Sequence, residues 1–136
     1  KADISKAEYE GRSFTYARGG PAGWLDYKNA AEKAWTALYQ AIDVLLHNNN
    51  VKSQHGGRNE HDREMPESPI LGHYDRKLAL IKLEKSNQDI ASKHYYDRYV
   101  SITAGLRNNS NYYTKQDIEL VKWEASRVKD IINELK

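Results

Sequence analysis

The sequence predicts an all-α fold, an up-and-down bundle of about five helices within a single domain over residues 1–136. Apolar residues recur at spacings of three and four along most of the chain, which is the period of one helix face. Glycine, proline and asparagine gather between these segments, where they end helices. A chain of 136 residues with 39% apolar composition is large enough to bury one hydrophobic core.

The first predicted helix ends at the Arg-Gly-Gly-Pro run of residues 18–21. Two glycines followed by a proline combine a flexible backbone with a lost amide donor. Asp3 or Ser5 is placed to cap the start, because a short side-chain oxygen accepts from the free amides of a first turn. The apolar face of this helix consists of Ile4, Ala7, Gly11 and Phe14.

The central helix, from about Trp24 to His47, has the most regular pattern in the chain. Its alanines leave little side-chain bulk, so a neighbouring helix can approach closely. Asparagines 48–50 end it, because asparagine tolerates the left-handed conformation found at helix C-termini. One apolar row consists of Tyr27, Ala31, Ala34, Leu38, Ala41 and Leu45, and a second row of Ala30, Trp35, Ile42 and Leu46.

A long polar loop, about residues 48–69, is followed by three further predicted helices. The third helix carries Leu71, Tyr74, Leu78 and Ile81 at helical spacing. The fourth begins at about Asn87 and carries Ala91, Tyr95, Arg98, Ile102 and Gly105. The last begins near Thr114 with a stripe of Ile118, Val121, Ala125, Val128, Ile132 and Leu135.

Composition and charge exclude several classes of function. The chain has no cysteine, so it can form neither a disulfide nor a thiolate metal site, and we expect a cytoplasmic protein. The net charge of +2 is too small for strong, sequence-independent nucleic-acid binding, which neutralises many phosphates. No apolar run approaches the roughly 20 residues of a membrane span, so we predict no membrane partner.

The polar loop holds two histidines and a glutamate, His55, Glu60 and His61. These residue types can ligate zinc, but a site needs three or four convergent ligands and the spacing matches no established pattern. We therefore predict no metal and no cofactor.

A second candidate site lies where the fourth helix ends, at residues 107–113. Guanidinium, amide and phenol groups together suit a phosphate or a nucleobase. The alternative is an asparagine turn that ends the helix, with its tyrosines packed beneath it. The predicted ligand-binding residues are Arg98, Arg107, Asn108 and Tyr112, and no catalytic residue is predicted.

The aromatic set is skewed, with ten tyrosines and three tryptophans against one phenylalanine. Tyrosine and tryptophan suit half-wet positions and are enriched at interfaces. A tyrosine cluster on the fourth helix is therefore either a dimer surface or the rim of the monomer core.

Residues 26–37, Asp-Tyr-Lys-Asn-Ala-Ala-Glu-Lys-Ala-Trp-Thr-Ala, resemble the second helix of the higher eukaryotes and prokaryotes nucleotide-binding (HEPN) superfamily. The resemblance implies an up-and-down helical bundle and a homodimer, with a nucleotidyltransferase partner or RNase toxin activity. The RNase members carry an arginine, usually a polar residue next, and a histidine separated from the arginine by four to six residues. Here Arg107 and Asn108 match the front of that motif, and Tyr112, Tyr113 and Thr114 stand where the histidine is expected.

These observations predict a non-catalytic, HEPN-like dimer that binds a protein partner or a nucleotide or RNA ligand. Tyrosine is a poor general base near neutral pH, which disfavours RNA cleavage. Two alternatives stay open. One is an RNase toxin of a toxin–antitoxin pair, with a histidine such as His94 reaching Arg107. The other is a purely structural bundle.

Overall fold

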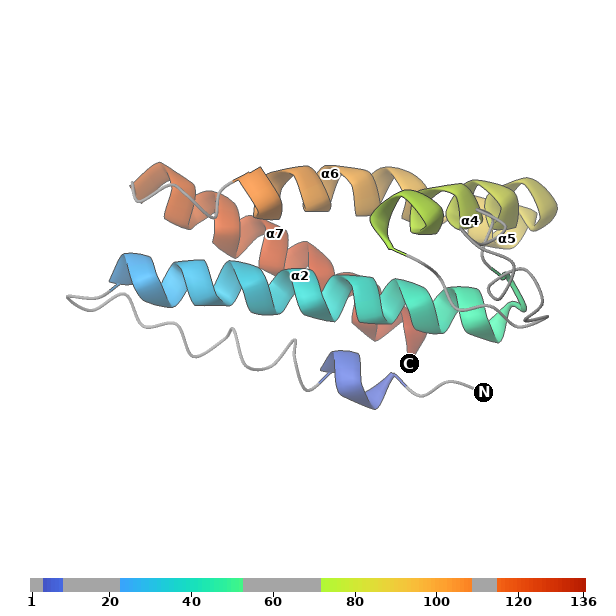
Figure 1. Cartoon of the computed structure of the whole chain (residues 1–136), viewed down its shortest axis with the longest axis horizontal. Coiled ribbons are helices and arrows are strands. Elements are labelled where there is room, and N and C mark those ends of the chain that lie inside the picture. The colour runs from blue at the N-terminus through green and yellow to red at the C-terminus, as the bar shows by residue number, and fades with distance from the viewer. Residues whose placement is uncertain (1–3, 9–22, 53–71, 109–114) are drawn as a thin grey trace, which may run out of the picture. The chain divides into compact units, whose positions relative to one another are not determined.

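Every regular element in the described part of the chain is a helix. The computed structural model describes residues 4–8, 23–52, 72–108 and 115–136. It confirms the all-α helical-bundle class and the expected number of about five helices within those ranges. The helices are α2 (Gly23–Asn48), α4 (His73–Ser86), α5 (Gln88–Ala91), α6 (Tyr95–Asn108) and α7 (Lys115–Leu135) (Figure 1).

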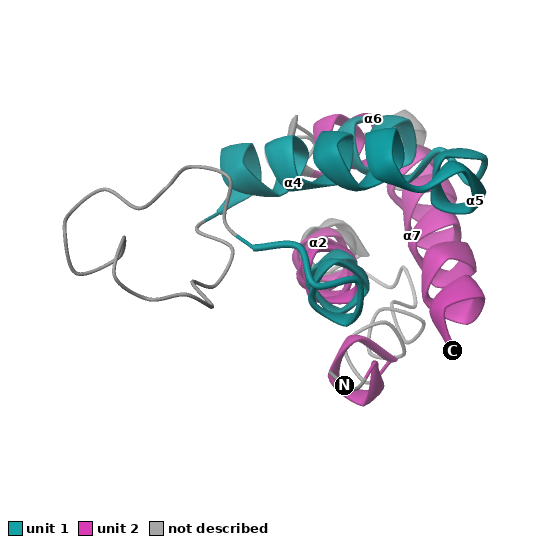
Figure 2. Cartoon of the chain, turned by 90° about the vertical axis from the view of Figure 1, so that its right-hand side faces the viewer, with its two compact units in different colours: residues 1–2, 42–100 teal, residues 3–41, 101–136 magenta. Residues whose placement is uncertain are grey.

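The chain divides into two compact units, which are coloured separately in Figure 2. The first unit contains residues 1–2 and 42–100, and the second contains residues 3–41 and 101–136. The boundaries fall inside α2 and inside α6, so each of these helices contributes to both units. A single domain over residues 1–136 stays a prediction.

The core of the first unit comes from the end of α2, one face of α4 and the beginning of α6. Aliphatic side chains dominate it, and burying one such side chain contributes about 1.5–3 kcal/mol. Its apolar members are Ile42, Leu45, Leu46, Ala79, Leu80, Leu83, Tyr95 and Tyr99.

The core of the second unit follows the predicted periodicity of the central and last helices. Every member of the two α2 rows within residues 30–41 is buried except Trp35, which is half-buried. On α7, Val121, Ala125, Val128 and Ile132 are buried as predicted, and Ile131 joins them. The period of three and four therefore identified the inward faces of both long helices.

The end of α2 confirms the predicted role of its asparagines. Asn50 has a φ of 59°, in the left-handed region that asparagine tolerates better than most residues. The Asn50 amide donates to the His47 carbonyl (3.0 Å), and the Val51 amide to the Leu46 carbonyl (2.9 Å). These two bonds form a Schellman motif, which satisfies carbonyls that a helix end leaves without partners.

The predicted fourth helix is wrong in one respect, because it is two helices. The single turn α5 begins after Asn87, whose side-chain oxygen accepts from the Ile90 amide at 3.1 Å. The chain then turns through His94, which has a φ of 58°, before α6 begins at Tyr95. Glu84 on α4 restarts the helix, since its carboxylate accepts from the Tyr96 amide at 2.7 Å.

The face of α4 that packs on the core also differs from the predicted row. Tyr74 is 60% exposed, Leu78 and Ile81 are half-buried, and Leu71 lies outside the described residues. The opposite face is buried instead, and it includes two charged residues, Asp75 and Arg76. Because α4 has apolar side chains on both faces, the spacing alone could not choose between them.

Gly72 begins α4 with a φ of 137° and a ψ of −166°. Residues that carry a side chain rarely adopt this backbone conformation, although no atom within 4 Å would block a Cβ there. The Arg76 amide donates to the Gly72 carbonyl at 2.8 Å, which closes the first turn. Glycine therefore suits this position at the start of α4.

Candidate functional site

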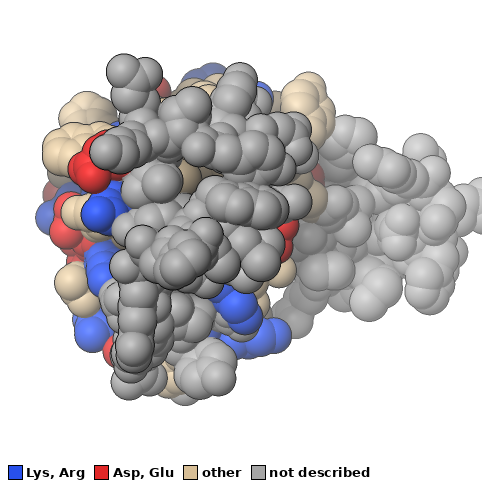
Figure 3. Space-filling view, turned by 90° about the vertical axis from the view of Figure 1, so that its left-hand side faces the viewer, with Lys and Arg blue, Asp and Glu red and all other residues tan. Residues whose placement is uncertain are grey.

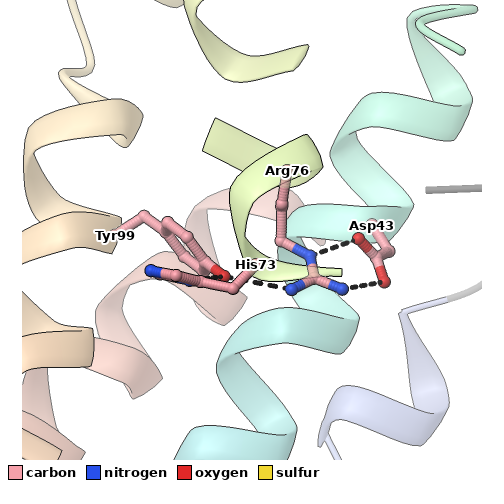
Figure 4. A network of polar contacts seen from close by, with 4 residues as sticks. All are labelled: Asp43, His73, Arg76 and Tyr99. Atoms are coloured by element: carbon pink, nitrogen blue, oxygen red, sulfur yellow. Dashed lines mark hydrogen bonds and ion pairs between the residues drawn. The ribbon is translucent and has the colours of Figure 1, made fainter. Parts of the chain in front are cut away.

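Four polar side chains of the first unit form one connected network. Asp43 comes from α2, His73 and Arg76 from successive turns of α4, and Tyr99 from α6 (Figure 4). Arg76 is 6% exposed and Tyr99 is fully buried. The network therefore lies among the apolar residues that hold these three helix segments together.

Arg76 donates three hydrogen bonds within this network. Its Nε and Nη2 atoms donate to the two carboxylate oxygens of Asp43, at 2.7 and 3.1 Å. Its Nη1 atom donates to the Tyr99 hydroxyl at 3.0 Å. Two parallel bonds to one carboxylate are the strong, directional arrangement that suits a guanidinium.

Burial and pairing act in opposite directions on both charged groups. Burial raises the pKa of the Asp43 carboxyl above its ordinary value of 3.8, against the lowering effect of the hydrogen bond and charge of Arg76, and the charge of Asp75 adds to the rise. At Arg76, burial acts to lower the pKa, but the hydrogen bond and charge of Asp43, with Tyr99, raise it above the ordinary value. Arg76 therefore stays charged, and Asp43 takes up a proton more readily than an exposed aspartate does.

His73 lies at the edge of the network and is the second hydrogen-bond partner of the Tyr99 hydroxyl, beside Arg76. Its Nδ1 atom is 2.8 Å from Tyr99 Oη, and the two rings lie 5.3 Å apart between centroids. Because Tyr99 Oη already accepts from Arg76, its own proton is available for Nδ1 of a neutral His73. A protonated His73 would instead bring a second positive charge close to Arg76.

The geometry suits positioning of α4 better than chemistry on a substrate. The Tyr99 hydroxyl and the Arg76 guanidinium are buried and use their hydrogen bonds on each other and on their neighbours. A group that acts on a substrate must be able to reach it. The network instead determines which face of α4 points inward, because Arg76 must meet Asp43.

Replacing Tyr99 with phenylalanine should lower the free energy of unfolding by about 1–2 kcal/mol, because Arg76 Nη1 and His73 Nδ1 each lose a buried partner. Urea unfolding measures this change. Tyr96→Phe on the same helix is the matched control and should change stability by less than about 0.5 kcal/mol. Equal changes for the two variants would show that the Tyr99 hydroxyl contributes nothing particular.

The second unit contains a smaller polar cluster between α6 and α7. Arg127 Nη1 donates to Glu124 Oε1 at 2.9 Å and to Ser101 Oγ at 3.0 Å. The Glu124 side chain is only 4% exposed. Its carboxylate lies directly against Gly105, where a Cβ atom would collide with it.

The predicted ligand-binding residues do not form one described site. Arg98 on α6 donates to the Lys93 carbonyl at 3.2 Å and lies over the Tyr95 ring, 5.4 Å from its centroid. Arg107 and Asn108 belong to the last turn of α6, and their side chains lie outside the described residues, as does Tyr112. His94 precedes α6 and Arg107 is near its other end, so the structure lends no support to a His94–Arg107 pair.

The structure describes the tyrosines of the predicted fourth helix but not the histidines of the polar loop. Of the tyrosines on the predicted fourth helix, Tyr95 and Tyr99 are 3% and 0% exposed and belong to the core, and Tyr96 is half-buried. The histidines of the polar loop lie outside the described residues. Among the residues that the structure describes, no three histidine, aspartate or glutamate side chains gather as a metal site would need.

The outward side of α4 is a further candidate site, which the sequence did not predict. We call it the α4 outer face and define it by Tyr74, Lys77, Leu78, Ile81, Lys82 and Lys85. An open pocket of about 500 Å³ lies on it, and its described lining consists of Leu78, Ile81, Lys82, Lys85 and Ser86. The network turns this face outward, because it holds the opposite face against α2 and α6.

Charges elsewhere on the described surface are mixed. On the side of the molecule drawn in Figure 3, basic and acidic side chains are interspersed over the described part, as expected for a net charge of +2. The described helices also include none that is both long enough and apolar enough to cross a membrane.

Comparisons with protein-family models, with curated proteins and with solved structures find no match to this chain.

Proposed function

We propose that the protein is a non-catalytic helical protein whose function is to bind another protein through the α4 outer face. The observation that carries this proposal is that α4 turns Tyr74, Leu78 and Ile81 away from the core of its unit. Tyr74 is exposed there and Leu78 and Ile81 are half-buried, and apolar side chains gathered on one outward helix face are typical of interaction sites.

The buried network supports this proposal, because it stabilises the presentation of the face. Turning α4 about its axis to bury Leu78 and Ile81 would remove Arg76 from Asp43 and Tyr99. Such a change leaves buried charged and polar groups without partners, which costs several kcal/mol. The face is therefore held outward in advance of binding, which lowers the entropic cost of binding.

The resemblance of residues 26–37 to HEPN proteins supports the same class of function. It implies an association with a second protein, either another copy or a nucleotidyltransferase-type partner. RNA or nucleotide binding at Arg98, Arg107, Asn108 and Tyr112 is the competing proposal. The engagement of Arg98 with Lys93 and Tyr95 gives that proposal less support.

Site-specific photo-cross-linking in the native cells tests the proposal. A photoreactive residue in place of Lys82, which is exposed on the α4 outer face, should give one discrete protein adduct. The same residue in place of Asp130, exposed on α7, is the matched control and should give none. The half-buried Leu78 provides a second check, because Leu78→Gln should abolish the adduct while circular dichroism stays helical.

An adduct of equal strength at Lys82 and Asp130 would contradict the proposal, as would no adduct at Lys82. A nucleic-acid adduct at Lys82 in place of a protein would favour the competing proposal.

A further inference from the structure

We infer that the α4 outer face binds an acidic amphipathic helix of the partner protein. This inference rests on the proposed function and names the chemistry of its partner. The shape, the residue spacing and the charge of the face all support it.

The spacing of the apolar residues fits a helix laid along α4. Tyr74, Leu78 and Ile81 are separated by four and three residues, so they form one line along the helix. The pocket that Leu78 and Ile81 line is open. An amphipathic helix fits such a surface with apolar residues at i, i+3 or i+4, and i+7.

The charge on this face has one sign. The only acidic residues of α4 are Asp75 and Glu84. Asp75 is buried on the inward face, and the Glu84 carboxylate accepts from the Tyr96 amide. The α4 outer face therefore carries lysines alone, namely Lys77, Lys82 and Lys85.

Lys77 and Lys82 flank the apolar line on its two sides, and Lys85 lies on the line itself, one turn after Ile81. Helical geometry places Lys77 and Lys82 about 140° apart around the axis, with Leu78 and Ile81 between them. None of the three lysines forms an ion pair with a residue that the structure describes. A partner helix with apolar residues along its centre and carboxylates on both flanks matches this arrangement.

A second copy of the chain fits this face poorly. An antiparallel pairing of two α4 helices about Leu78 and Ile81 places each flank beside the same flank of the other copy, so Lys77 lies beside Lys77 and Lys82 beside Lys82. No acidic side chain on the outer face offsets this repulsion. Like charges placed opposite each other suppress an interface, so the charge favours a different, acidic partner.

The exposed pair Leu120 and Trp123 on α7 is a weaker alternative for the same role. Trp123 is 64% exposed. Its neighbours Glu119 and Lys122 carry opposite charges and lie 3.7 Å apart as an ion pair. That surface therefore does not specify the charge of a partner, whereas the α4 outer face does.

Designed peptides test the inference on the full chain. The probe is a labelled peptide of about 18 residues, long enough to form a helix, with leucines along one face and glutamates elsewhere. Fluorescence anisotropy should show saturable binding that weakens as salt is raised. A peptide of identical composition with its leucines scrambled should bind at least tenfold more weakly.

Charge reversal on the chain supplies the matched comparison. Lys82→Glu with Lys85→Glu should weaken binding of the acidic peptide about tenfold or more and should create binding of the lysine counterpart of the peptide. Lys6→Glu with Lys93→Glu changes the net charge equally at two exposed positions outside the face and should leave binding within about twofold.

The results separate this inference from the proposed function. A Lys82 adduct to a protein, combined with equal affinity for the ordered and the scrambled peptides, overturns the inference and leaves the proposed function standing. Tighter binding to phosphatidylserine vesicles or to duplex RNA than to the acidic peptide also overturns the inference. Loss of binding in the Lys6 and Lys93 control as well would show net-charge attraction only and would overturn it too.

Discussion

Replacing Arg76 with methionine should lower the free energy of unfolding by about 3 kcal/mol at neutral pH. Methionine keeps most of the buried stem but removes the donors on which Asp43 and Tyr99 depend. The side chain of Asp43 is 35% exposed, so water recovers part of the loss and the effect falls short of that of a fully buried pair. Urea unfolding followed by circular dichroism measures the change.

The cost of Arg76→Met should also depend on pH. A carboxyl whose pKa is raised by folding contributes stability below its ordinary value, and this contribution is lost as the pH rises through the folded value. Burial already raises the pKa of Asp43, and losing Arg76 removes the main opposing effect. At about pH 7 the variant must bury an unpaired charge or bind a proton, whereas at about pH 4 protonation costs little. The loss should therefore be smaller at about pH 4.

Asp43→Asn provides the control for the pH dependence of the Arg76→Met loss. The amide has no charge to bury, so Arg76→Met in an Asp43→Asn background should show the same loss at both pH values. Equal losses at about pH 7 and pH 4 in the wild-type background would contradict the role assigned to the Asp43 carboxyl.

Gly105→Ala should destabilise the protein by about 1–2 kcal/mol, although alanine is the better helix former. Replacing glycine in a helix normally gains up to about 1 kcal/mol. Here a Cβ atom at position 105 collides with the Glu124 carboxylate. The buried Glu124 side chain has to shift, which strains its hydrogen bond to Arg127, and overpacking of this kind costs about 1–3 kcal/mol. Thermal and urea unfolding of the variant measure the sum.

The sign of this effect should reverse when the carboxylate is removed. In a Glu124→Ala background the space beside position 105 is open, so Gly105→Ala should stabilise that protein by about 0.5–1 kcal/mol. The comparison is a double-mutant cycle between two residues in contact. A loss of the same size in both backgrounds would mean that the Glu124 carboxylate does not cause it.

The sequence predicted the elements whose pattern is one-sided. On α2 and α7, apolar residues occupy one face and polar residues the other, so the spacing identifies which side chains are buried. Leu38 and Val128 are examples, and both are fully buried. The end of α2 was also predictable, because a run of asparagines after an apolar helical pattern indicates a helix C-terminus.

The orientation of α4 could not be predicted, because its two faces are similarly apolar. Leu80 and Leu83 compete with Leu78 and Ile81 for the core. The choice depends on Arg76 meeting Asp43, a partner 33 residues earlier in the chain. A local pattern does not contain that pairing. The polar network could not be predicted for the same reason. The predicted sites are runs of polar residues close together in the sequence, whereas the network consists of polar residues far apart in the sequence, on three helices.

The break between α5 and α6 had a weak local signal. Asn87 is a good cap, but nothing nearby in the sequence indicates that the helix restarts at Tyr95. The restart depends on Glu84, which approaches from α4.

That contact between α4 and the first turn of α6 also has a consequence for the order of folding. The negative charge of Glu84 compensates the positive end of the α6 dipole and satisfies an amide that α6 cannot satisfy by itself. Before α4 is in place, α6 lacks this cap and its first turn frays. Nucleation of the two helices is therefore cooperative, and protection of the Tyr96 amide from hydrogen exchange should arise together with α4 and not with α6 alone.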